Sequence, residues 1–146
     1  MIDFETIAKA PVATEPFSYF ACENVLSADT LKAVGADFPQ ITRPGIFTLS
    51  DLTYGPNFAR LIHEINAPEL EDIMQDKFGV DLSDKPIMIT IRGHCQRKDG
   101  RIHTDSKDKI VTCLLYLNDP VWGEQGGRLR LLRNGEDLNS TIAEVG

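Results

Sequence analysis

The triplet His103-Thr104-Asp105 places an imidazole and a carboxylate two residues apart. In an extended chain, the side chains of residues i and i+2 project to the same side, so the two groups can converge on one cation. One nitrogen and one oxygen donor are two of the three ligands in the 2-His-1-carboxylate arrangement, which binds iron(II) and leaves positions open for other ligands. The plainer interpretation is a surface loop in which both side chains are solvated or pair with each other.

The segment that follows the triplet, Ile110–Leu117 (IVTCLLYL), is rich in residues that favour β-strands. Thr112, Leu114 and Tyr116 alternate along it and would share one face of a strand. We expect this face to look inward, with the two hydroxyl groups beside the metal. A dicarboxylate cosubstrate needs such donors at its far carboxylate. For Tyr116 the alternative is a half-buried strand aromatic with no binding role.

The elements that position these residues begin with a helical half. Ser27 is a suitable N-cap for a helix that Pro39 would end. Asn57 is a candidate cap for a second helix, and Pro68 a candidate first residue of a third that Gly79 would end. The helical portion is therefore expected to cover about 1–85.

From Pro86 the pattern changes to an alternation typical of strands, expected at 86–92, 110–117 and 127–133, with Thr141–Val145 as the start of another. Helices followed by consecutive strands predict an α+β fold with a barrel or jelly roll, in a single domain over 1–146. Three strands do not close a barrel. We therefore expect the strand portion, about 86–146, to be incomplete at its C-terminal end.

Composition excludes several classes of function. The 146 residues, 42% hydrophobic and 25% charged, fit one folded domain. A net charge of -7 argues against a nucleic-acid partner, which needs an excess of positive charge. The sequence has no apolar run long enough for a membrane span and no basic-then-apolar leader at its start, so we expect a cytoplasmic protein.

A resemblance to a known family is carried by Gly100–Leu132, about a quarter of the chain. This segment combines the H-x-D triplet, the pattern T-x-L-x-Y-L-N at Thr112–Asn118, and the pair Gly126/Gly127 opening a predicted strand. It resembles the metal-binding strands of the prolyl-4-hydroxylase-like 2-oxoglutarate/iron(II) oxygenases. The combination is far more specific than the triplet alone.

The resemblance implies a double-stranded β-helix (a jelly roll) with His103 and Asp105 as ligands to Fe(II). Tyr116 matches a tyrosine that helps to hold the distal carboxylate of 2-oxoglutarate, and Thr112 and Leu114 match pocket-lining positions. The implied activity is a dioxygenase that decarboxylates 2-oxoglutarate to succinate and hydroxylates a small-molecule or peptidyl substrate.

The sequence departs from the family in one respect. The family has a second histidine several strands after the H-x-D, followed by an Arg or Lys that pairs with the cosubstrate carboxylate. No histidine follows Asp105 here, because the other two are His63, in the predicted helical half, and His94, before the triplet. Three arginines come too early to match the basic residue: Arg128, Arg130 and Arg133. We therefore expect either a fragment that lacks the third metal ligand or a degenerate, non-catalytic relative.

The rival hypothesis belongs to a different class. It is a non-catalytic jelly-roll binding module related to the cupins, in which His103 and Asp105 hold no redox metal. A later histidine and basic residue in a longer reading frame would favour the oxygenase.

Overall fold

The computed structural model describes residues 1–94, 96, 99–118 and 127–145. The chain divides into two compact units, which we describe separately. The first comprises Met1–Ala10 and Cys22–Cys95, and the second comprises Pro11–Ala21 and Gln96–Gly146. The single domain expected from the sequence stays a prediction, because a compact unit need not be an independently folding domain.

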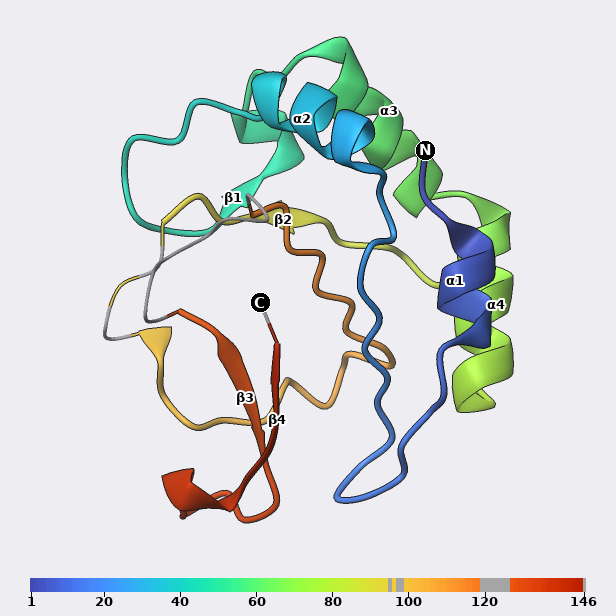
Figure 1. The fold of residues 1–146 in the computed structure, drawn as a ribbon, viewed down its shortest axis with the longest axis vertical. Coiled ribbons are helices and arrows are strands. Elements are labelled where there is room, and N and C mark those ends of the chain that lie inside the picture. Colours follow the sequence, from blue (N-terminus) through green and yellow to red (C-terminus); the bar gives the residue numbers. More distant parts are fainter. Residues whose placement is uncertain (95, 97–98, 119–126, 146) are drawn as a thin grey trace. The chain divides into compact units, whose positions relative to one another are not determined.

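The first unit is mainly helical. Its helices are α1 (Phe4–Lys9), α2 (Ala28–Ala36), α3 (Pro56–Ile65) and α4 (Pro68–Phe78). Helix α1 packs against α4, and α2 packs against α3 (Figure 1). Apolar side chains from all four helices form the buried core of the described residues: Ile7, Val34, Phe58, Leu61, Leu70 and Met74. Phe38 and Tyr54 meet Phe58 edge-on, with ring centroids 5.3 and 5.1 Å away.

Two of the predicted helices begin where the sequence indicated. The Ser27 side chain accepts a hydrogen bond from the Thr30 amide at the start of α2, as an N-cap does. Pro68 is the first residue of α4, and Gly79 ends that helix in the left-handed conformation at φ 63°. Glycine adopts this conformation without the steric cost that a Cβ atom brings.

The prediction that Asn57 caps a helix was wrong. The cap lies two residues earlier, at Gly55, and helix α3 begins at Pro56. The acceptor is Asp37, just after α2, which receives hydrogen bonds from the Asn57 amide (2.6 Å) and side chain (2.8 Å). A Cβ atom on Gly55 would lie only 2.4 Å from the Asp37 carboxyl carbon, so glycine lets the cap approach. The cap comes from a residue 20 positions away.

The strands are shorter than predicted. In the first unit, β1 (Phe47–Thr48) pairs antiparallel with β2 (Thr90–Ile91), so only two residues of the expected strand 86–92 are in a ladder. In the second unit, β3 (Leu129–Leu132) pairs antiparallel with β4 (Thr141–Val145), which confirms strands in these two regions. Leu129 lies opposite Val145, and Leu131 lies opposite Ala143. Gly126, part of the predicted Gly-Gly opening, lies outside the described residues.

The strand predicted over 110–117 is not formed. A β-prone sequence fits a pleated surface, but it becomes a strand only where a neighbour supplies the hydrogen bonds.

The mixture of helices and antiparallel strands confirms the α+β class. The described strands form two separate two-stranded sheets and do not make up a jelly roll. Among the described residues, no helix combines the length and the apolar character needed to cross a membrane.

Candidate metal centre

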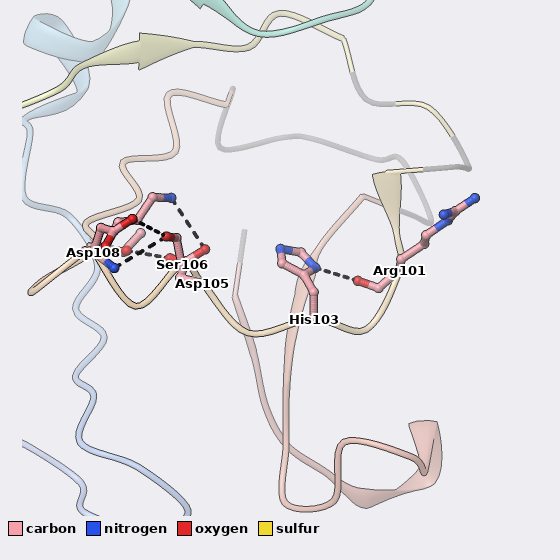
Figure 2. Close-up of polar contacts among 7 residues, drawn as sticks. Arg101, His103, Asp105, Ser106 and Asp108 are labelled. Atoms are coloured by element: carbon pink, nitrogen blue, oxygen red, sulfur yellow. Dashed lines mark hydrogen bonds and ion pairs between the residues drawn. The ribbon is translucent and has the colours of Figure 1, made fainter.

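His103 lies in an irregular, exposed segment of the second unit. Its Nδ1 atom is 2.7 Å from the carbonyl oxygen of Arg101 (Figure 2). A carbonyl oxygen only accepts hydrogen bonds, so Nδ1 carries the proton. In the neutral ring this leaves the lone pair on Nε2, which is the nitrogen available to a metal ion.

The Asp105 carboxylate has a different partner on each of its oxygens. Thr112 Oγ1 donates a hydrogen bond of 2.5 Å to Oδ2, and Lys109 Nζ lies 3.6 Å from Oδ1. The hydrogen bond from Thr112 lowers the pKa of the Asp105 carboxyl most; partial burial opposes this, and the positive charges of Lys109 and His103 add to the lowering. Asp105 is therefore an anion at neutral pH, as a metal ligand must be.

A tight turn brings Lys109 back to Asp105. The Lys109 amide donates to the Ser106 carbonyl at 3.0 Å, and the Asp108 amide is 3.4 Å from the Ser106 hydroxyl. A serine that bonds the backbone two residues later is a common way to start such a turn. Sequence analysis missed Lys109, although its spacing of four residues from Asp105 and the intervening Ser-Lys-Asp were available signals.

The two predicted ligands make separate sets of contacts. Figure 2 shows the His103 ring directed to the Arg101 carbonyl, while Asp105 belongs to a group of contacts with the turn that contains Ser106 and Asp108. The positive charge of His103 contributes to the lowered pKa of Asp105, so the two groups lie within electrostatic range. Joint coordination of one ion stays a prediction. Within the described part of the chain, no group of three or more His, Cys, Asp or Glu side chains is arranged to hold a metal.

The three predicted cosubstrate residues are exposed, whereas we expected them to face inward. Leu114 is 57% exposed and Tyr116 is 36% exposed, and Thr112 is exposed as well. The more buried residues of the segment are Val111, Leu115 and Leu117, whereas Cys113 is exposed like its neighbours. The physical reason is that no strand forms here, so no sheet defines an inner face. Thr112 is brought to the candidate centre through its hydrogen bond to Asp105. The roles of Leu114 and Tyr116 in cosubstrate binding stay predictions.

The other histidines belong to the first unit. His63 is exposed on α3, as expected of a histidine on a helix face. His94 follows β2, and its Nε2 lies 3.0 Å from the carbonyl oxygen of Ile41. With that contact, Nε2 of His94 serves the backbone of a loop within its own unit.

Comparison with known proteins gave no relatives: no family model, no curated protein and no solved structure matches this chain.

Proposed function

We propose that this chain provides two metal ligands, His103 and Asp105, to an Fe(II)- and 2-oxoglutarate-dependent dioxygenase. The proposed substrate is a small molecule or a peptidyl side chain that becomes hydroxylated, and the proposed architecture around the site is a double-stranded β-helix. The sequence pattern of Gly100–Leu132, the contact of His103 with the Arg101 carbonyl and the lowered pKa of Asp105 support this proposal.

The observation that carries the proposal is the hydrogen bond from His103 Nδ1 to the Arg101 carbonyl. Histidines that bind metals typically donate their other ring N–H to a carboxylate or a backbone carbonyl, which fixes the tautomer and the ring orientation. The exposed His94 also contacts a backbone carbonyl, so the contact of His103 supports the proposal only together with the sequence pattern of Gly100–Leu132. Here the bond leaves Nε2 as the nitrogen donor.

Asp105 and Thr112 fit the same arrangement. The Thr112 hydroxyl holds Oδ2 at 2.5 Å, which limits rotation of the carboxylate and keeps it ionised. Oδ1 is then the oxygen donor that would bind a cation. An imidazole nitrogen together with a carboxylate oxygen is a donor set suited to iron(II). A third protein ligand is not assigned.

The metal and the protein residues would have different roles. Bound Fe(II) would supply the redox chemistry by which dioxygen converts 2-oxoglutarate to succinate and carbon dioxide and delivers one oxygen atom to the substrate C–H bond. His103 and Asp105 would hold the ion, with the Arg101 carbonyl and Thr112 fixing their orientation. In the proposed pocket, Tyr116 would help to hold the distal carboxylate of 2-oxoglutarate and Leu114 would contribute apolar lining.

One observation favours the rival function, a non-catalytic binding module. Both oxygens of Asp105 already have protein partners, as in a carboxylate whose role is to organise a loop. In that case Asp105 would stabilise the turn and bind no metal.

Metal binding separates the two functions. We expect the chain to bind Mn²⁺, a redox-stable substitute for Fe(II), and expect His103→Ala and Asp105→Ala each to weaken binding at least tenfold, because each removes one of the donors. His63→Ala is the matched control and should bind like the wild type, since His63 lies on α3 in the other unit. Binding would be measured by electron paramagnetic resonance of free Mn²⁺. Equal affinities in all four proteins would reject the metal centre.

A further inference from the structure

A groove of about 460 Å³ lies between α1 and α4, two helices of the first unit that pack against each other (Figure 1). Phe4 and Ala8 of α1 and Ile73 of α4 give it an apolar lining. The rest of the lining is acidic: Glu5, Glu69, Asp72 and Asp76. Phe4 and Ile73 are half-buried whereas the four carboxylates are exposed, so the groove has an apolar floor and a negatively charged rim.

The carboxylates on α4 form an acidic stripe along the groove, consisting of Glu69, Asp72 and Asp76. They are separated by three and four residues, a spacing that puts successive side chains on one face of a helix. At about 1.5 Å of rise per residue, the stripe extends over roughly two turns. A ligand that meets the whole stripe needs positive charges that repeat with a similar spacing.

The protein does not neutralise the acidic stripe itself. In the part of the chain that the structure describes, none of the three carboxylates on α4 forms an ion pair. Lys9 pairs with Glu5 on α1, and the Lys77 ammonium group donates a hydrogen bond to the Ala8 carbonyl at 3.0 Å. The stripe therefore presents its negative charge to the solvent side of the groove.

Helix stability does not explain the acidic stripe either. Asp72 and Asp76 are four residues apart, so their like charges repel each other. Asp76 also lies in the last turn of α4, where the free carbonyl groups disfavour a carboxylate. A positively charged ligand would offset both costs.

We propose that this groove is the docking site for a basic amphipathic helix of a partner protein. Apolar residues of that helix cover Phe4 and Ile73, and its lysines or arginines pair with the acidic stripe. A fully polar cation would leave the apolar floor in contact with water, and a fully apolar partner would leave the carboxylates without counter-charge. The inference is independent of the proposed metal centre, because the groove lies within the first unit.

The experiment measures binding of a fluorescein-labelled helical peptide to the full chain by fluorescence anisotropy. The peptide has leucines at positions i, i+3, i+4 and i+7 and lysines elsewhere. Asp72→Asn/Asp76→Asn removes two negative charges from the groove, and Glu23→Gln/Asp29→Asn removes two exposed negative charges elsewhere in the first unit. Because exposed ion pairs are individually weak, we expect the groove variant to bind about five- to tenfold more weakly and the control variant within about twofold of the wild type.

Two further comparisons test the apolar floor. Ala8→Gln puts a longer, neutral side chain into the groove and keeps a residue that favours helices. Ala36→Gln, at the exposed end of α2, is its matched control. We expect Ala8→Gln alone to weaken binding, and we expect a peptide with serines in place of the leucines to bind at least about tenfold more weakly to the wild type.

Weaker binding that is confined to the groove variants and to the serine peptide supports the docking site. Equal losses in the two double variants would show that the peptide responds only to the net charge of -7, and the groove would be rejected. If the serine peptide or spermine bound as tightly as the leucine peptide, the groove would be a site for polycations and not for an amphipathic helix. Absence of measurable binding by the wild type would also reject the proposal.

Discussion

Replacing Thr112 with valine tests whether the hydroxyl positions Asp105 for a metal. Valine has nearly the same shape as threonine but cannot donate the 2.5 Å hydrogen bond to Oδ2. Because that bond is the largest cause of the lowered pKa of Asp105, we expect the pKa to rise toward its ordinary value in Thr112→Val. We also expect Mn²⁺ binding to weaken.

Two opposing effects decide the size of the change in affinity. A carboxylate that loses a hydrogen-bond donor becomes more basic, which slightly favours metal binding. It also loses its fixed orientation, and removal of an outer partner of a metal ligand typically costs about 10- to 100-fold in affinity. The second effect is larger, because Asp105 is ionised at neutral pH with or without Thr112. Since the Asp105 side chain is 42% exposed, we take the lower end and expect about tenfold weaker binding.

Thr112→Ser is the matched control, because serine keeps the hydroxyl and loses only a methyl group. Carbon-13 NMR would follow the Asp105 carboxyl resonance against pH in the absence of metal, and electron paramagnetic resonance would give the Mn²⁺ affinity. We expect Thr112→Ser to resemble the wild type in both measurements. A raised pKa in Thr112→Val with unchanged Mn²⁺ affinity would refute the reasoning, since Thr112 would then affect the charge of Asp105 without positioning it.

Two further predictions concern the helices of the first unit. Asp37→Ala should lower the free energy of unfolding by about 1 kcal/mol, measured by urea denaturation, because it removes the acceptor at the start of α3. The control is Asp51→Ala, at the end of the 3-10 helix Leu49–Asp51, which removes only an exposed hydrogen bond from Thr48; an equal loss in both variants would contradict the prediction. Glu64→Gln should lower the free energy of unfolding by about 1 kcal/mol at pH 7, because the neutral amide can still accept the Ile2 amide but loses the negative charge that strengthens this 2.7 Å hydrogen bond and pairs with the N-terminal amine. Burial raises the pKa of Glu64, but this hydrogen bond and the ion pairs with the N-terminal amine and Arg60 outweigh it, so the pKa is lowered. The stabilisation by Glu64 is therefore complete above its ordinary pKa of 4.5 and disappears as the pH falls through the lower pKa of the folded protein. If the difference in stability between the wild type and Glu64→Gln stayed the same at low pH, this explanation would be ruled out.

The sequence predicted those parts of the fold that depend on near neighbours. Ser27 and Pro68 mark their helices through contacts within one turn, and Gly79 ends α4 through its own backbone freedom. The cap of α3 could not be found in this way, because Asp37 reaches it from 20 residues away. The strand expected at 110–117 failed for a similar reason, since a ladder depends on a second segment and not on β-propensity alone.

The candidate centre also combines features that nearby residues determine with features that have no local signature in the sequence. The i, i+2 spacing of His103 and Asp105 is local and was visible at once. The Arg101 carbonyl that fixes the His103 ring is a backbone group and has no signature in the sequence. Lys109 was within reach of sequence reasoning, because a lysine four residues after an aspartate, with Ser106 starting a turn between them, favours an ion pair.

Lys109 also separates the two candidate functions, because they assign it opposite effects. In a metal centre it would compete with the ion for Oδ1 of Asp105, so its removal would favour the metal-bound state. In a binding module without metal it is a partner of Asp105, so its removal loosens the turn and does not raise the affinity for Mn²⁺. The contact is the same 3.6 Å ion pair in both cases, and the distance alone does not choose between them. What distinguishes them is the sign of the change in Mn²⁺ affinity when the charge at position 109 is removed.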